Sequence, residues 1–174
     1  MRKKKKIMTS AEKKAAVQAE DIQGRDKMQK LIDQYPERLY DYYFTPNQYD
    51  WIDLFTTAST TLKTAAIEIK NRHNKSTDFK DWYLEPHKYN ELKMVQEASG
   101  HTPYYVNFFD DGLVAIWNIA KLGDLTKRIE MRRASDTTAY NYKKGATLKP
   151  EIPLKLEEAT VISYGTQGDN TTAS

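Results

Sequence analysis

The stretch Ile67-Glu68-Ile69-Lys70 constrains the fold of this chain more than any other. Two isoleucines alternate with a carboxylate and an ammonium, which is typical of a β-strand, because successive side chains point to opposite faces. Ile67 and Ile69 are therefore expected in the core, with Glu68 and Lys70 together on the other face. Burying a carboxylate beside an ammonium is costly unless the two have further partners or a functional role. The face that carries them is therefore a candidate site.

A second run, residues 49–55, precedes this strand and is also predicted to be a strand. Ile52 and Leu54 would join the core, which places Asp53 on the opposite face. Asp50 is the alternative acid, but it would share a face with Ile52 and Leu54, which favours a turn residue at the strand entry. An acid from this run and the acid and lysine of the next strand would then converge at adjacent strand ends. That set is the minimum that holds a divalent metal and activates a water molecule.

This arrangement resembles the signature of the PD-(D/E)XK (restriction-endonuclease-like) nuclease superfamily. Asp53 is followed after fourteen residues by Glu68-Ile69-Lys70, and the sequence IEIKNR, a helix and the strands PYYVNFF and GLVAIWNI come next. The likeness covers residues 20 to 120 as an order of elements, and it departs from the motif in having no proline before Asp53. It implies an α/β domain with a restriction-endonuclease-like core, a central mixed β-sheet of about four to five strands flanked by helices.

Helices are predicted on both sides of these strands. Residues 10–34 form the first, with Ser10 as a candidate cap, an interruption at Gly24 and an end at Pro36. Apolar residues at helical spacing follow the interruption and predict a buried stripe: Met28, Leu31, Ile32 and Tyr35. A second helix is expected over residues 86–98, between Pro86 and Ser99-Gly100.

The remaining segments give weaker or simpler patterns. Residues 38–46 fit either a strand or an irregular approach, and residues 71–85 read as a polar loop. Strands are expected over 64–71, 103–109 and 113–119, the last two joined by a hairpin turn at Asp110-Asp111-Gly112. The alternation of Ile152, Leu154 and Leu156 indicates an edge strand.

The resemblance implies metal-assisted hydrolysis of DNA phosphodiester bonds. Asp53 and Glu68 would bind Mg²⁺ or Mn²⁺, with the Ile69 carbonyl as a third ligand, because hard cations prefer oxygen ligands. Lys70 would orient the attacking water or stabilise the transition state. The expected enzyme is therefore a Mg²⁺-dependent deoxyribonuclease.

Further members of the site are candidates by position. Lys88 on the predicted second helix is a fourth catalytic candidate, with a surface lysine as the alternative. An acid on the first helix would complete the set, and Glu20 or Asp26 are the candidates. Arg72, directly after the motif, is placed to contact a phosphate, with a surface arginine as the alternative.

Composition sets the domain organisation and the charge. The 174 residues predict one nuclease-like domain over 10–164, with disordered tails at 1–9 and 165–174. Residues 2–6 are five consecutive bases, and without them 22 Lys+Arg face 24 Asp+Glu, a net charge of −2. Lys3, Lys4 and Lys5 are therefore candidate DNA contacts, with a solubilising arm as the alternative.

Partners and setting follow from the same composition. No apolar stretch approaches a membrane span, so no membrane partner is expected. The absence of cysteine is compatible with a reducing cytoplasm, and the small size suggests a bacterial or phage-infected host cell. DNA is the expected partner, and a homodimer is possible because two strands need two sites.

Two other readings stay open at this level. The chain could be a catalytically silent nuclease-like fold that serves as a DNA-binding or assembly protein, or an unrelated small α/β interaction domain. Geometry separates them, because a nuclease must bring the carboxylates of Asp53 and Glu68 and the ammonium of Lys70 into one pocket.

Deleting residues 2–6 tests the role of the basic tail. Because these residues carry the whole positive balance, their loss should weaken DNA binding and flatten its dependence on salt, as fewer counterions are released. Binding measured by fluorescence anisotropy from low to high salt checks this. An unchanged affinity at low salt would instead place the anchoring contacts on a folded patch such as Arg128, Arg132 and Arg133.

Overall fold

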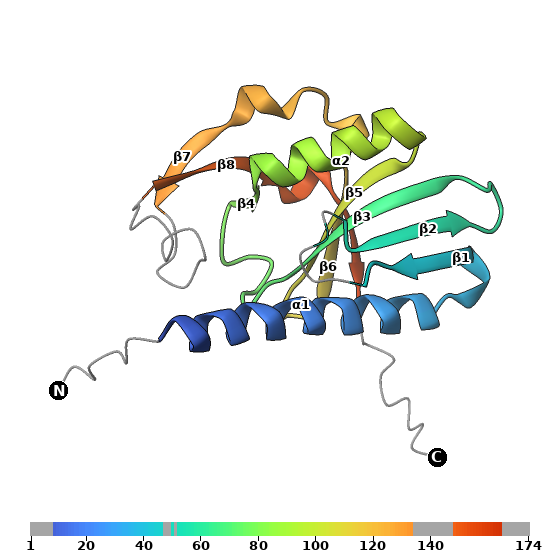
Figure 1. The fold of residues 1–174 in the computed structure, drawn as a ribbon, viewed down its shortest axis with the longest axis horizontal. Helices are drawn as coiled ribbons and strands as arrows, with labels where there is room; N and C mark the ends of the chain where they lie inside the picture. Colours follow the sequence, from blue (N-terminus) through green and yellow to red (C-terminus); the bar gives the residue numbers. More distant parts are fainter. Residues whose placement is uncertain (1–8, 47–49, 51, 134–147, 165–174) are drawn as a thin grey trace, which may run out of the picture.

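A mixed β-sheet lies between two helices in the computed structural model, which describes residues 9–46, 50, 52–133 and 148–164 (Figure 1). Helix α1 (Ser10–Asp33) runs along one face of the sheet, and α2 (Pro86–Ser99) packs on the other. The sheet has six strands in the order β1-β2-β3-β5-β6-β9. Their bounds are Leu39–Phe44, Leu54–Ala58, Thr64–Asn71, Thr102–Phe108, Leu113–Asn118 and Thr160–Ser163. Only the central pair, β3 and β5, is parallel; the other neighbours are antiparallel.

A second sheet of three strands lies on the same side as α2 (Figure 1). Its order is β4-β8-β7, with bounds Asp81–Leu84, Leu148–Lys155 and Glu130–Arg133. The prediction of a continuous polar loop over 71–85 is therefore wrong at its end, where Trp82 and Leu84 are buried and form β4. The prediction of an edge strand near residue 152 is also wrong, because β8 is the middle strand and pairs on both sides.

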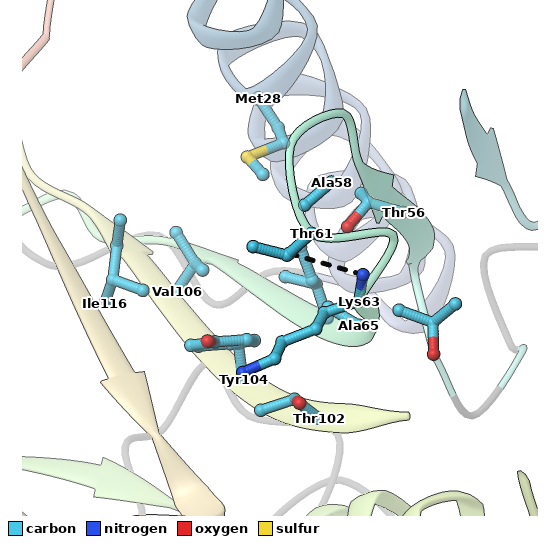
Figure 2. Close-up of a pocket in the computed structure, with 12 residues that line it drawn as sticks. Met28, Thr56, Ala58, Thr61, Lys63, Ala65, Thr102, Tyr104, Val106 and Ile116 are labelled. Atoms are coloured by element: carbon cyan, nitrogen blue, oxygen red, sulfur yellow. Dashed lines mark hydrogen bonds between the residues drawn. The ribbon is translucent and has the colours of Figure 1, made fainter. Parts of the chain in front are cut away.

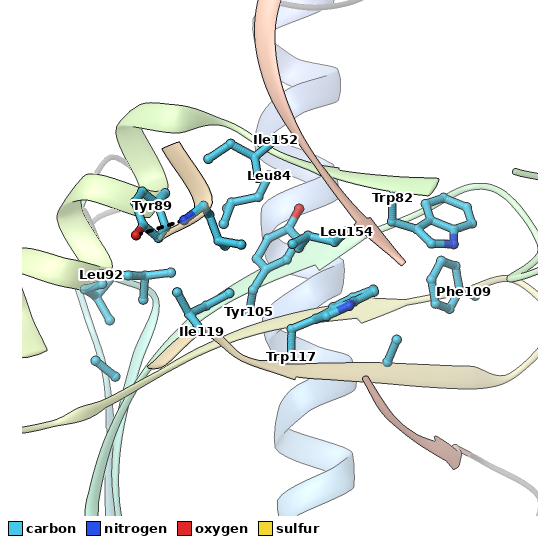
Figure 3. Packing of buried hydrophobic residues seen from close by; sticks show 14 residues of the cluster. Trp82, Leu84, Tyr89, Leu92, Tyr105, Phe109, Trp117, Ile119, Ile152 and Leu154 are labelled. Carbon is cyan, nitrogen blue, oxygen red and sulfur yellow. Dashed lines mark hydrogen bonds between the residues drawn. The ribbon is translucent and has the colours of Figure 1, made fainter. Parts of the chain in front are cut away.

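Two hydrophobic clusters, one on each face of the main sheet, form the core. The cluster under α1 contains Met28, Leu31, Ile32, Leu54, Ile67, Ile69, Val106, Phe108 and Val114. The cluster under α2 and the small sheet is larger and rich in aromatic residues, among them Trp82, Tyr89, Tyr105, Phe109 and Trp117 (Figure 3). Because both faces of β3 are covered, two of its polar residues, Glu68 and Asn71, are buried along with its apolar residues.

Helix α1 is continuous, so the predicted interruption at Gly24 is wrong. A Cβ atom at Gly24 would lie 3.2 Å from Cγ2 of Ile69, which is tighter than an ordinary contact. Glycine therefore allows the helix to approach β3 closely. The helix is capped by Thr9, whose hydroxyl accepts the N–H of Glu12, rather than by Ser10.

The strand predicted over 49–55 is wrong in its bounds, because β2 spans Leu54–Ala58, and Ile52 and Leu54 lie in different core clusters. Most other predicted elements are confirmed, with small changes at their ends. The strand over 64–71 and the α/β class are as predicted, although the sheet has six strands instead of four to five. Helix α2 begins at Pro86 and ends before Gly100, whose φ of 73° suits glycine. The undecided segment 38–46 contains β1. Tyr35 lies beyond α1 and is 38% exposed, so it does not belong to the buried stripe.

No helix in the described part of the chain is long and apolar enough to cross a membrane.

Replacing Gly24 with valine tests the close approach of α1 to β3. The added side chain would press on Ile69 and Asn71, and overpacking of this kind costs about 1–3 kcal/mol of unfolding free energy. Urea denaturation of Gly24→Val should show this loss. Ala19→Val, at an exposed position of the same helix, is the control and should cost well under 1 kcal/mol, roughly the loss of helix propensity. Equal losses in the two variants would contradict the packing argument.

Candidate active site

Glu68 is enclosed at the centre of β3, on the face that α2 covers. It pairs in register with Tyr105 of β5 and is only 8% exposed. Its Oε2 atom is buried and has no hydrogen-bond partner in the part of the chain that the structure describes. A buried carboxylate oxygen without a partner is costly, so this atom has capacity for a further donor or a cation.

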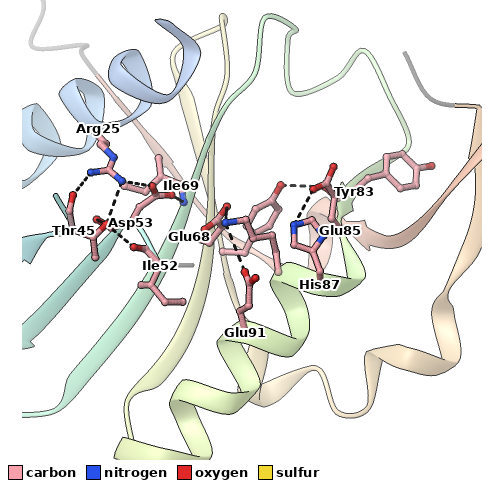
Figure 4. A network of polar contacts seen from close by, with 12 residues as sticks. Arg25, Thr45, Ile52, Asp53, Glu68, Ile69, Tyr83, Glu85, His87 and Glu91 are labelled. Carbon is pink, nitrogen blue, oxygen red and sulfur yellow. Dashed lines mark hydrogen bonds and ion pairs between the residues drawn. The ribbon is translucent and has the colours of Figure 1, made fainter. Parts of the chain in front are cut away.

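Asp53 lies beside β3, one residue before β2 begins (Figure 4). Its backbone N–H donates to the carbonyl of Ile67, and its Oδ2 atom accepts the N–H of Ile69 at 2.8 Å. The carboxylate therefore continues the pairing of β3 where the β2 ladder ends. Oδ1 accepts a hydrogen bond from Arg25 of α1, also at 2.8 Å.

The backbone of Ile69 adds a possible oxygen ligand. In a strand, the N–H and C=O of one residue point to the same side. Since the N–H of Ile69 points toward Asp53, its carbonyl points to that side too, past the start of β2. The Ile69 carbonyl and the Asp53 carboxylate therefore lie on the same edge of β3, next to Glu68.

Lys88 reaches the site from the first turn of α2. Its Nζ atom is 3.3 Å from Oε1 of Glu68 and 3.7 Å from Oε2 of Glu91, one turn further along the helix (Figure 4). All three side chains are largely enclosed: the exposed fraction of the side chain alone is 24% for Lys88, 11% for Glu68 and 15% for Glu91. Lys88 is therefore the protein's own counter-cation for Glu68.

Lys70 lies on the same face of β3 as Glu68. It makes no hydrogen bond or ion pair among the residues that the structure describes, and its charge interacts with Asp21, Glu68 and Glu85. Its register partner on β5 is Asn107, which is fully buried and has no hydrogen-bond partner for either amide atom among the same residues. The ammonium of Lys70 is thus available to a ligand beside the acidic pair.

Burial dominates the electrostatics of the acids. It raises the pKa of Glu68 to about 8, with a further upward contribution from the negative charge of Asp53 that Lys88 and Lys70 only partly offset. Burial also raises the pKa of Asp21 on α1, and the positive charge of Lys70 opposes this. The mutual influence of Asp53, Glu68, Lys70 and Asp21 shows that they share one electrostatic environment.

The first-helix acid nearest this environment is Asp21, and neither predicted candidate takes its place. Glu20 lies 3.7 Å from His73 and forms an ion pair with it when the histidine is protonated. Asp26 is exposed and its charge acts on Tyr164 instead. The sequence could have indicated Asp21. The buried face of the helix that contains Met28 continues toward the N-terminus through Gly24, one turn earlier, to Asp21, two turns earlier. The assumed break at Gly24 concealed it.

The other predicted site residues lie as follows. Arg72 points inward, where Nη2 donates to the Tyr83 carbonyl and to the Tyr105 hydroxyl, both at 2.8 Å, so it ties β3 to β4. Arg72 thus has a structural role, and its phosphate contact stays a prediction. Asp50 is half-buried in the segment between β1 and β2. Lys3, Lys4 and Lys5 lie outside the described residues.

A cavity of about 320 Å³ lies elsewhere, on the α1 face of the sheet (Figure 2). Met28, Ile67 and Val106 contribute apolar walls, and Lys63 and Tyr104 are its ionisable lining residues. Glu68 points to the opposite face, so this cavity is separate from the acidic cluster. Among the described residues, no group of three or more His, Cys, Asp or Glu side chains is arranged to hold a metal. The expected set of two carboxylates and one backbone carbonyl does not require such a group.

Comparison with known proteins supports the fold. No family model matches the chain, and no curated protein matches it in sequence. Among solved structures, Hjc, a Holliday junction resolvase from Archaeoglobus fulgidus, is similar with a TM-score of 0.51 and 10% identity. The match covers 80% of this chain and 92% of that one. Hjc belongs to the PD-(D/E)XK superfamily, so the resemblance read from the sequence is confirmed at the level of structure. The chain therefore shares the restriction-endonuclease-like fold of this resolvase.

Proposed function

We propose that this protein is a metal-dependent nuclease that hydrolyses DNA phosphodiester bonds. The observation that supports this most is the grouping of Asp53, Glu68 and the Ile69 carbonyl at one edge of β3. Lys70 lies on the face of Glu68 and makes no hydrogen bond or ion pair with any residue that the structure describes. Glu68, Ile69 and Lys70 belong to β3 and Asp53 directly precedes β2, so the start of β2 beside the middle of β3 brings them together. The fold similarity to a DNA resolvase agrees with the proposal.

The donor set fits Mg²⁺ or Mn²⁺. It consists of hard oxygen atoms, and Oε2 of Glu68 is a buried acceptor without a partner among the described residues. Asp53 and Glu68 would hold the ion with the Ile69 carbonyl. When bound, such an ion supplies the positive charge that acidifies water and offsets charge on the phosphate.

The chain's own groups would do the rest. Lys70 would hold the attacking water or donate to a phosphate oxygen, since its ammonium has no hydrogen-bond or ion-pair partner in the described part of the chain and its charge acts on the acids. Ile69 would orient Asp53 through its N–H. Arg25 would hold the second oxygen of Asp53 in place from α1. Each carboxylate oxygen keeps acceptor capacity beyond one hydrogen bond, so these contacts leave room for a ligand.

One observation favours the second candidate, a catalytically silent DNA-binding fold. Both oxygens of Asp53 already accept hydrogen bonds, from Arg25 and from Ile69, and Glu68 already has Lys88. A site neutralised in this way is stable without metal. Cleavage assays on the wild type separate the two candidates.

The partner in this proposal is DNA, and a homodimer would supply one site for each strand. Because the similar structure is that of a Holliday junction resolvase, a four-way junction is the first substrate to test, beside duplex and single-stranded DNA. The proposed setting is the cytoplasm of a bacterial or phage-infected cell.

Removing any member of the site should stop cleavage. Asp53→Asn, Glu68→Ala and Lys70→Ala should each lower the rate by about 10²–10³-fold, as loss of one preorganised electrostatic contact does, while DNA binding persists. The assay compares Mg²⁺, Mn²⁺ and EDTA on the three DNA forms. Glu97→Ala and Lys121→Ala, at exposed positions, are matched controls and should retain activity. Cleavage by Glu68→Ala would remove the assignment, and an inactive wild type on every substrate would favour the silent fold.

Stability of the metal-free protein should depend on pH through Glu68. Its pKa rises from 4.5 to about 8 on folding, so between these values the folded state keeps a proton that the unfolded chain has lost. The contribution of Glu68 to the free energy of unfolding should therefore be largest below about pH 4.5 and fall by a few kcal/mol between pH 4.5 and about 8. Urea denaturation in EDTA measures it.

Glu68→Gln should remove this part of the slope and be more stable than the wild type at pH 8, because the buried group no longer ionises. Glu97→Gln, which changes an exposed carboxylate on α2, is the control and should keep the wild-type slope. A wild-type slope in Glu68→Gln would mean that other groups cause the pH dependence.

A further inference from the structure

Lys88 bridges two carboxylates that are both enclosed. Its Nζ atom lies 3.3 Å from Oε1 of Glu68 and 3.7 Å from Oε2 of Glu91. Glu91 follows Lys88 by three residues on α2, so the two side chains lie on the same face of the helix. Glu91 is only 15% exposed although it is charged, which places it inside the site and not on the solvent surface.

One ammonium cannot fully satisfy both acids. Oε2 of Glu68 and Oε2 of Glu91 are both buried and without a hydrogen-bond partner among the described residues, although Lys88 is within ion-pair distance of the latter. The contact with Glu91 is the longer of the two. Glu91 therefore has unused capacity to accept a hydrogen bond from Lys88 if the lysine leaves Glu68.

The neighbouring pair of Arg25 and Asp53 differs in this respect. Arg25 also donates to the backbone carbonyl and the hydroxyl of Thr45, so further contacts hold it in place. The ion pairs of Lys88 are to Glu68 and Glu91 alone among the described residues. A lysine side chain is flexible and its ammonium can rotate its donors, so Lys88 can move between two acids that are already within reach.

A divalent cation on Glu68 would repel the ammonium that now occupies that carboxylate. We propose that Lys88 is the resident counter-cation of Glu68, and that Glu91 is a positioning residue which takes over Lys88 when a divalent cation binds Glu68. Metal binding is then an exchange of one cation for another. This inference rests on the proposed function only in assigning Glu68 as a metal ligand, and it does not require cleavage.

Metal affinity in a double-mutant cycle tests the exchange. The dissociation constant of Mn²⁺ is measured by calorimetry on the full chain for the wild type, E91Q, K88M and K88M/E91Q. E91Q should weaken binding by about tenfold, within the usual range of coupling between sites, because Lys88 then has no carboxylate other than Glu68. K88M should bind Mn²⁺ more tightly than the wild type, because the competing cation is gone. E91Q should matter less in the K88M background than in the wild type.

Two further variants separate positioning from simple structural loss. E91D keeps the charge and should restore much of the affinity lost in E91Q, whereas E97Q changes an exposed acid on the same helix and should leave the affinity unchanged. Thermal melting in EDTA checks that each variant is folded. If K88M does not fold, E91Q and E91D still decide, since equal affinity in E91Q and the wild type overturns the proposal.

The remaining outcomes are equally clear. A loss from E91Q that is as large or larger in the K88M background would make Glu91 a direct ligand and overturn the exchange. Weaker binding by K88M would also overturn it. A wild type that does not bind Mn²⁺ overturns both this inference and the proposed function, whereas a wild type that binds Mn²⁺ with no effect of E91Q overturns the inference alone.

Discussion

The rest of the site depends on a carboxylate buried in the middle of a central strand. Glu68 is 8% exposed between β3, β5 and α2, and an ion there is tolerated only with compensation from nearby groups. Lys88 supplies part of that compensation from α2. The position of α2 over β3 is therefore tied to the charge as well as to the apolar cluster beneath the helix.

A second constraint is the point at which β2 begins. Asp53 precedes the strand, and its side chain, instead of a further ladder residue, receives the N–H of Ile69. The Asp53 carboxylate accepts the hydrogen bond that a backbone carbonyl of a longer β2 would otherwise accept. An acid therefore lies against β3, and the N–H of Ile69 still has a partner. Each helix then provides a base for one acid: Arg25 from α1 for Asp53, and Lys88 from α2 for Glu68. The protein's own cations therefore balance both acids.

Sequence patterns within a few residues were enough to predict the elements that depend only on nearby residues. The alternation around Glu68 predicted β3 with its correct bounds, and Pro86 with Gly100 predicted α2. Patterns whose meaning depends on a distant neighbour gave wrong predictions. Gly24 looked like a helix break, but it is required by the approach of Ile69. The pairing partners of β4 and β8 are about 70 residues apart in the chain, so neither strand could be placed from its own residues.

The sequence by itself determined the parity of β3: because strand side chains alternate, Glu68 and Lys70 had to share one face and Ile67 and Ile69 the other. The preference for Asp53 over Asp50 remains a prediction, and its premise was wrong, because β2 begins only at Leu54 and Ile52 and Leu54 lie in different core clusters. Only the tertiary structure decided which side chains from the helices lie near Glu68 and Asp53. Asp21, Glu91 and the inward turn of Arg72 follow from how α1, α2 and β4 pack on the sheet. Helix rotation is set by the fit of whole apolar faces and by close approaches such as that at Gly24, which are contacts between segments far apart in the chain.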